Sequence, residues 1–366
     1  MSIDLPADSI AVVLGTRPEA IKLAGIVELL GPAAWVVHSG QHYDAGLAAD
    51  VLVSLGFPAA DVQLSSGGAS RGTQVGHAVI HLDELFARHR PRVVVVQGDT
   101  NTVLAGGLAA SSAGVPLVHV EAGLRSRDRD MPEETNRVVA DHLADLCCAP
   151  TTVNVANLAA EGITGDRVAL TGNTVVESVL RLVPARAERT AILAAMDLRA
   201  NGFVLATVHR PENVDRPGPL AAVLTELGNL PLPVVLPIHP RTASRIDQFG
   251  MSTLLEPIRV VPPLTPRQFL GLAAETALLV SDSGGIQEEA SVLKRPVLVV
   301  RRSTERPEVQ GTFAELVDPG PAIGERARAW LSDPTRLAAI TGLPSPYGDG
   351  SASTRIVALL RERWGG

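Results

Sequence analysis

Short uninterrupted apolar runs, each followed by a polar turn and a helical pattern, constrain this sequence more than any other feature. In the first half these runs are Ile10–Leu14, Trp35–His38, Arg92–Val96, Pro116–Val120 and Val168–Leu170. In the second half they are Phe203–Val208, Val234–Ile238, Ala277–Val280 and Pro296–Val300. Strands buried on both faces of a parallel sheet are apolar throughout in this way. The sequence therefore predicts an α/β fold with parallel sheets.

The length of 366 residues predicts two domains. A polar, helical stretch after Gly172 places the boundary near residues 172–185. We expect an N-terminal Rossmann-like domain at residues 1–173 and a C-terminal one at 174–351. The helix at 352–366 is a candidate for packing back on the first domain. Each sheet would offer its carboxyl strand ends to a cleft between the domains, because ligands bind at those ends.

Composition excludes several classes of function. The net charge of −7 and the aromatic content of 3% argue against a nucleic-acid partner. The only two cysteines, Cys147 and Cys148, are adjacent, so they form neither a disulfide framework nor a metal site, which fits a reducing compartment. We find no signal peptide and no stretch long enough to span a membrane. We expect a cytoplasmic protein without a membrane or metal partner.

Carboxylates gather at the predicted strand ends of the first domain. Asp99 and Glu121 each follow an apolar run, and Glu133 and Glu134 stand in the first turn of a helix opened by proline. Carboxylates held near one another have pKa values that are pushed apart, as acid–base chemistry requires. A purely structural interpretation also stays open: Asp99 as a helix N-cap, and Asp130 with Glu133 as a capping pair.

Cationic groups form the second pattern. Arg17 and Lys22 lie at the start of the first helix, where they suit phosphate or sugar oxygens or are simply solvated. Strand ends of the second domain carry a predicted cationic wall of His209, Arg210, His239 and Arg241.

A third pattern is Ser283-Gly284-Gly285 directly before a helix. Its glycines would let backbone N–H groups approach a phosphate, and Glu289 could accept from ribose hydroxyls. An ordinary tight turn is the alternative. Taken together, the three patterns suit a substrate with a diphosphate at one end and a reacting sugar at the other.

With these residues in view, the chain resembles the non-hydrolysing bacterial UDP-N-acetylglucosamine 2-epimerases. The shared motifs run nearly from end to end: GTRPEAIKLA (15–24), GQHYD (40–44), GDTNT (98–102), HVEAGLRS (119–126), MPEETNR (131–137), GNT (172–174), HRPENVD (209–215), HPRT (239–242), DSGGIQEEA (282–290) and TERPE (304–308). The ordered set is far more specific than any single motif.

The resemblance implies a GT-B glycosyltransferase-type fold, a homodimer, and reversible interconversion of UDP-GlcNAc and UDP-ManNAc. In that family UDP is eliminated to give a bound 2-acetamidoglucal and then adds back after C2 is reprotonated from the opposite face. No metal and no nicotinamide cofactor is implied. Two alternatives stay open, a hydrolysing 2-epimerase that releases UDP and ManNAc, and a glycosyltransferase of the same fold that uses a UDP-sugar.

The resemblance also assigns residues. The catalytic groups it implies are Asp99, Glu121, Glu133 and His209. The substrate-binding groups that it implies are Arg17, Lys22, Gln41, Arg137, Arg210, His239, Phe269, Ser283, Gly284, Gly285, Glu289 and Arg306.

Three departures from the family pattern bear on specificity. Arg302 stands where many members have an acid, so the preference at the sugar end of the substrate is open. The loop between Glu121 and Glu133 has the short form. Some members are activated by UDP-GlcNAc through glutamines near Gln41, but Asp44 replaces the second glutamine here, and activation is not predicted.

Overall fold

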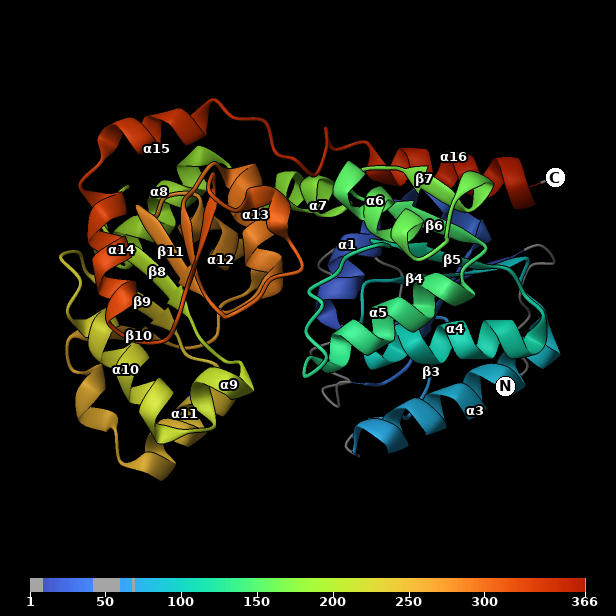
Figure 1. The fold of residues 1–366 in the computed structure, drawn as a ribbon, viewed down its shortest axis with the longest axis horizontal. Helices are drawn as coiled ribbons and strands as arrows, with labels where there is room; N and C mark the ends of the chain where they lie inside the picture. Colours follow the sequence, from blue (N-terminus) through green and yellow to red (C-terminus); the bar gives the residue numbers. More distant parts are fainter. Residues whose placement is uncertain (1–8, 42–59, 68–69, 366) are drawn as a thin grey trace. The chain divides into compact units, whose positions relative to one another are not determined.

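The computed structural model describes residues 9–41, 60–67 and 70–365. The chain divides into two compact units (Figure 1). Unit 1 comprises Met1–Ser178 and Tyr347–Gly366, and unit 2 comprises Val179–Pro346. Compared with the predicted division at residues 173 and 351, unit 1 keeps the first half of the helix Val175–Leu182, and unit 2 ends five residues earlier, at Pro346.

Unit 1 is built on a parallel sheet. Its described strands are β1 (Ile10–Leu14), β2 (Ala34–His38), β3 (Val62–Gln63), β4 (Val93–Gln97), β5 (Leu117–Val120), β6 (Leu146–Ala149) and β7 (Val168–Leu170). Their order is β3-β2-β1-β4-β5-β6-β7, with every pairing parallel. This is the strand order of a Rossmann-type sheet, in which the sequence of strands turns from one side of β1 to the other while all strands stay parallel.

The helices in the described part of unit 1 are α1 (Arg17–Leu30), α3 (Arg71–His89), α4 (Asn101–Ala113), α5 (Pro132–Leu143), α6 (Thr152–Ala160), α7 (Val175–Leu182) and α16 (Ala352–Trp364), with short 3-10 turns η1 (Gly31–Ala33) and η2 (Gly165–Arg167). One core joins alternate residues of the strands to α3, α4, α5 and α6. The other strand residues point to the opposite face. Figure 1 shows α16 beside α1, and the two helices are in contact.

Unit 2 repeats this architecture. Its strands are β8 (Val204–Thr207), β9 (Val234–Pro237), β10 (Ile258–Val261), β11 (Leu278–Ser281), β12 (Val297–Val300) and β13 (Ala314–Val317), in the order β10-β9-β8-β11-β12-β13. Its helices are α8 (Arg186–Ala195), α9 (Pro211–Val214), α10 (Pro217–Gly228), α11 (Pro240–Phe249), α12 (Pro266–Ala273), α13 (Gly284–Leu293), α14 (Pro321–Leu331) and α15 (Pro334–Thr341), with 3-10 turns η3 (Ser252–Leu255) and η4 (Pro307–Val309). The predicted fold class, two Rossmann-like α/β domains, is confirmed.

The predicted apolar runs did not include β6, which begins at Leu146, shortly after α5 ends at Leu143. Cys147 and Cys148 lie in that strand as free, fully buried thiols. No helix in the described ranges combines the length and the apolar character that crossing a bilayer requires.

Candidate functional site

Glu121 is a tightly held carboxylate of unit 1. It follows β5 directly, is 6% exposed, and has a left-handed backbone with φ of 68°. Its Oε2 lies 2.6 Å from the Nζ of Lys22, and the amide of Gln97 donates to the same oxygen. Non-glycine residues take this conformation only where the surroundings enforce it, often at functional sites. Lys22 is therefore a buried partner of Glu121, and its interpretation as a solvated charge is wrong.

Asp99 lies in the loop after β4, the strand that pairs with β5. Arg137 of α5 binds its carboxylate through two nitrogens, and the Asn136 amide donates to its backbone carbonyl at 2.8 Å. The N-cap of α4 is Thr100. The alternative of Asp99 as that cap is therefore wrong, and its carboxylate is held by a cation instead.

The two glutamates of the first turn of α5 have different surroundings. Glu134 is buried, accepts from the backbone N–H groups of Ser126 and Arg127, and pairs with Arg137. Glu133 is half-buried and has no hydrogen bond or ion pair with any described residue. The N-cap is Met131, without a side-chain cap, so the predicted Asp130–Glu133 capping pair is wrong. Glu134 therefore anchors the loop, whereas the Glu133 carboxylate makes no such contact with a described residue.

A fourth carboxylate, Glu19, was missing from the predicted site. Its Oε2 accepts from the N–H of Gly15 at 3.0 Å, and its Oε1 accepts from the Thr100 hydroxyl at 2.7 Å. Burial raises the pKa of Glu19 to about 7. Glu19 belongs to the motif Gly15–Ala24, which the sequence analysis identified. No local sequence pattern, however, pairs it with Thr100, 81 residues away.

Two further predicted residues of unit 1 lie near this network. Arg17 begins α1 and is exposed, so it is accessible to a ligand. The Gln41 side-chain oxygen accepts from both the N–H and the hydroxyl of Thr102, at 3.1 and 2.9 Å. Gln41 thus contacts the start of α4, whereas Asp44 falls outside the described residues.

In unit 2 a buried aspartate organises the loop after β8. Asp282, fully buried, accepts from the backbone N–H groups of His209 and Arg210 and from the amide of Asn213. Its Oδ1 also lies 3.3 Å from the Nδ1 of His209. Asp282 and Asn213 were not among the predicted site residues, although both belong to motifs shared with the family. Asp282 fixes the backbone that carries His209.

The predicted cationic wall is only partly present. The rings of His209 and His239 lie 5.2 Å apart. The Nδ1 of His239 accepts from the N–H of Arg241 at the start of α11. Arg241 forms an ion pair with Asp215, and Arg210 lies 3.6 Å from Glu212. Carboxylates therefore lie beside Arg210, Arg241 and His209, so this wall is less cationic than its sequence indicates.

The predicted phosphate cradle lies at the beginning of α13. Ser283 is the N-cap without a side-chain cap, and Gly284 and Gly285 are the first helical residues. A Cβ added to Gly284 would come within 2.8 Å of the Arg306 guanidinium, whereas around Gly285 the space is open. Free N–H groups at an open helix N-terminus suit an anion.

Three other predicted residues also belong to unit 2. Arg306 is buried, packs on Gly284, and pairs with Glu288 and Glu305. Glu289 is half-buried on the second turn of α13. Phe269 is half-buried in the first turns of α12. The structure gives Arg306 a clear packing role and leaves the ligand roles of all three as predictions.

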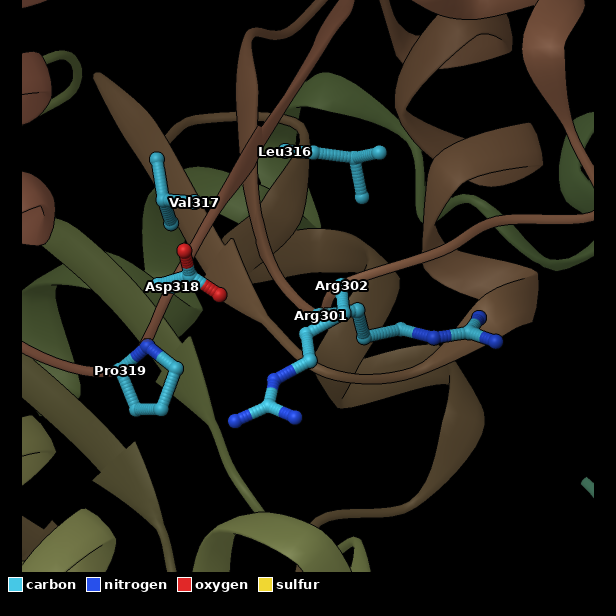
Figure 2. A pocket seen from close by; sticks show the side chains of 6 residues that line it. All are labelled: Arg301, Arg302, Leu316, Val317, Asp318 and Pro319. Carbon is cyan, nitrogen blue, oxygen red and sulfur yellow. The ribbon is translucent and has the colours of Figure 1, made fainter. Parts of the chain in front are cut away.

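A pocket of about 520 Å³ opens at the carboxyl ends of β12 and β13. Figure 2 shows its lining: Arg301, Arg302, Leu316, Val317, Asp318 and Pro319. Arg301 pairs with Glu305 at 2.9 Å, and Glu305 also pairs with Arg306. Arg302 is exposed and has no partner among the described residues. The pocket therefore adjoins the loop that packs on the α13 cradle.

Across the parts of the chain that the structure describes, no three His, Cys, Asp or Glu side chains are grouped to hold a metal ion. Glu121 and Asp99 are instead paired with Lys22 and Arg137, respectively. Unit 1 thus carries carboxylates with cationic partners. Unit 2, taken by itself, carries an open helix start and two neighbouring histidines.

Comparison with known proteins gives consistent matches. A family model described as UDP-N-acetylglucosamine 2-epimerase matches residues 33–361. A UDP-N-acetylglucosamine 2-epimerase of Methanococcus maripaludis is 37% identical, over 96% of this chain and 98% of that protein. A UDP-2,3-diacetamido-2,3-dideoxy-D-glucuronate 2-epimerase of Pseudomonas aeruginosa is 35% identical, over 96% of this chain and 99% of that protein.

A solved structure agrees with these matches. The crystal structure of the Methanocaldococcus jannaschii UDP-GlcNAc 2-epimerase, in complex with UDP-GlcNAc and UDP, superposes with a TM-score of 0.88. The two chains are 34% identical, and the match covers 97% of this chain and 99% of that one. The similarity therefore extends over both Rossmann-like units.

Proposed function

Because the chain belongs to the UDP-N-acetylglucosamine 2-epimerase family, we propose that it interconverts UDP-N-acetylglucosamine and UDP-N-acetylmannosamine. A base removes the C2 proton while the C1–O bond breaks, which leaves 2-acetamidoglucal and UDP. A proton then returns to the opposite face of C2 and UDP adds back at C1. The hydrogen moves as a proton, so the cycle needs neither oxidant nor reductant.

The observation that carries this proposal is the pair of carboxylates on neighbouring strand ends of unit 1. Asp99 and Glu121 are each fixed by a buried cation, Arg137 and Lys22 respectively. Groups held this rigidly can take or give a proton without first reorganising. Glu133, which lacks a partner among the described residues, is the third carboxylate that we propose for the chemistry.

Unit 2 supplies the groups that we propose for UDP. The N-terminus of α13, with Ser283, Gly284 and Gly285, suits the diphosphate. His209, oriented by Asp282, would neutralise the leaving phosphate oxygen. Phe269 and Glu289 are proposed to contact uracil and ribose. Arg17 of unit 1 is exposed and would add a cation to the diphosphate.

Solvent deuterium tests the reaction directly. Incubated with UDP-GlcNAc in heavy water, the protein should produce UDP-ManNAc and place deuterium at C2 of both sugars, as seen by proton NMR. Free ManNAc with UDP as the only products would favour the hydrolysing alternative. Unchanged UDP-GlcNAc would favour the glycosyltransferase alternative, which the epimerase names of the relatives above do not support.

Substitution separates chemistry from binding. We expect Asp99→Asn and Glu121→Gln each to lower kcat by about 10²–10⁴-fold, the usual contribution of a positioned acid or base. UDP affinity, measured by calorimetry, should stay within a few-fold. Asp130→Asn, an exposed carboxylate of the same loop region, is the matched control and should be fully active. Loss of UDP binding in the folded Asp99 or Glu121 variants would contradict their chemical role.

One observation favours a second candidate substrate. Arg302 is exposed without a partner among the described residues and lines the 520 Å³ pocket. One relative carries a glucuronate in its name, and a guanidinium suits a sugar carboxylate. The same epimerisation on a 6-carboxylated UDP-sugar is therefore the second candidate. UDP-N-acetylglucosaminuronate should then be turned over faster than UDP-GlcNAc, and Arg302→Asp should reverse that preference.

We further propose that the protein acts as a cytoplasmic homodimer, as the family resemblance implies. Sedimentation at micromolar concentration should give the mass of two chains. A single-chain mass with full activity would overturn this part of the proposal.

A further inference from the structure

His119 is a fully buried side chain of β5 whose ring meets an oxygen atom at each nitrogen. Its Nδ1 lies 2.6 Å from Oδ1 of Asp141, and its Nε2 lies 2.7 Å from the carbonyl oxygen of Gly98. A backbone carbonyl can only accept, so Nε2 must carry a hydrogen. The protonation of Nδ1 depends on whether Asp141 is ionised.

Asp141 is held as a carboxylate. Its second oxygen, Oδ2, accepts from the N–H of Gly123 at 3.1 Å and lies 2.7 Å from the Arg125 guanidinium. Burial by itself would raise the pKa of Asp141, but His119 and Arg125 hold it below its usual range. An ionised Asp141 only accepts, so both nitrogens of His119 carry hydrogens and the ring is an imidazolium.

The charges facing this ring support the same protonation state. Burial lowers the pKa of His119, but the Asp141 charge and the two hydrogen bonds outweigh it, so the pKa lies above its ordinary value. Arg125, from the loop after β5, opposes this weakly and is itself paired with Glu161. From β6, the Cys147 thiol donates to the Asp141 carbonyl and brings no charge.

The imidazolium connects the two loops that carry the catalytic carboxylates. Gly98 has a φ of 80° and directly precedes Asp99. Through Asp141, the same ring is joined to the N–H of Gly123, two residues after Glu121. The Asp99 loop is thus fixed to the Glu121 turn by one chain of charge-assisted hydrogen bonds, the stronger kind in proteins.

We infer that His119 is a positioning residue of the reaction: as a permanent imidazolium between Asp141 and the Gly98 carbonyl, it fixes Asp99 relative to Glu121. This role rests on the proposed function, since Asp99 and Glu121 are its catalytic carboxylates. His119 itself touches no substrate. Its loss should disturb the chemical step and leave nucleotide binding intact.

Nitrogen NMR of the full-length protein with ¹⁵N-labelled histidine tests the charge. We expect one histidine ring to keep both nitrogens protonated from pH 6 to pH 9. Exposed His142 of α5 provides a second histidine ring for comparison in the same spectra. If every histidine ring is neutral at pH 9, the inference is overturned, whether or not the protein has epimerase activity.

Kinetics test the positioning role. His119→Gln should lower kcat by about 10–100-fold, because a displacement of about 1 Å of a catalytic group can cost about 100-fold in rate. KM for the UDP-sugar and the affinity for UDP should change less than threefold. His142→Gln is the matched control and should behave as the parent protein. An unchanged kcat for folded His119→Gln overturns the inference, and an inactive parent protein instead contradicts the proposed function.

Discussion

Glu19 is a buried side chain near the proposed catalytic residues, and burial makes ionisation of its carboxyl group unfavourable. Its carboxylate accepts from Gly15 and Thr100, both in loops at the carboxyl ends of strands. These hydrogen bonds lower its pKa, but burial raises it more, to about 7 from the usual 4.5. The folded protein therefore binds the Glu19 proton more tightly than the unfolded chain does.

The pH dependence of stability follows from this shift. A raised pKa contributes stability that is fully present below pH 4.5 and is lost as the pH rises through 7. Glu19→Gln removes this loss, so its stability relative to the parent should improve by up to about 3 kcal/mol between pH 5 and pH 8. Urea unfolding at both pH values measures the difference. An equal difference at both values would contradict the raised pKa.

The control for that measurement is Glu28→Gln, which removes an exposed carboxylate from the same helix. It accounts for the general effect of losing one negative charge. We expect the Glu28 variant to follow the parent protein at both pH values.

At this scale the sequence predicted which residue types stand at strand ends, but not their partners. Asp99 and Glu121 were identifiable because apolar runs end directly before or near them. The pairing of Lys22 with Glu121 spans 99 residues, and no local pattern encodes it. Adjacent Glu133 and Glu134 were also indistinguishable in sequence, and only the folded loop shows that Glu134 is the structural one.

Among the elements, the turn after β5 is tightly enclosed. Gly123 has a φ of 82°, its N–H goes to Asp141, and its carbonyl accepts from the amide of Asn157 at 3.0 Å. A Cβ at Gly123 would lie 2.5 Å from the carbonyl oxygen of Asn154. The turn therefore requires glycine both for its backbone angle and for lack of space.

A matched pair of substitutions separates these two requirements. Gly162 has nearly the same φ, 81°, but open space around it. Gly162→Ala should cost only the left-handed strain, about 1–2 kcal/mol. Gly123→Ala should cost about 1–3 kcal/mol more, because the Asn154 carbonyl must move, and should lower kcat by displacing Glu121. Thermal unfolding and turnover measure both, and equal effects would contradict the steric argument.

Interior strands other than β6 could be predicted from sequence, whereas the edge strands β10 and β13 could not. β1, β4, β5, β8, β11 and β12 lie between other strands, so both of their faces are buried and their sequences are predominantly apolar. β10 and β13 lie at the edges and include Arg259 and Glu315. These polar residues interrupt the apolar run, and no prediction covered either strand.

At the scale of the whole molecule, α16 completes unit 1 from the far end of the chain. Ile356, Val357 and Leu360 are buried, and the Ser353 N–H donates to Glu177 at 2.7 Å. Arg92 donates to the Trp364 carbonyl at 2.7 Å. The helix is therefore a structural part of the unit that holds the carboxylates.

Truncating this contact should destabilise one unit selectively. Leu360→Ala should lower the free energy of unfolding of unit 1 by about 2–5 kcal/mol, the usual range for a fully buried leucine. Glu362→Ala, exposed on the same helix, should change it by less than about 0.5 kcal/mol. Calorimetry should show the unit 1 transition moving to lower temperature while UDP still shifts the unit 2 transition. A shift of both transitions together would contradict separate units.

The order of synthesis gives this arrangement a consequence. Residues 179–346 form unit 2 without interruption, so that unit is complete before the last segment of unit 1 leaves the ribosome. A message ending early, ahead of α16, would still encode the whole half that we propose to hold UDP. Such a truncated product would be an inactive protein that still binds nucleotide, and it would compete with the full-length protein for UDP-sugar.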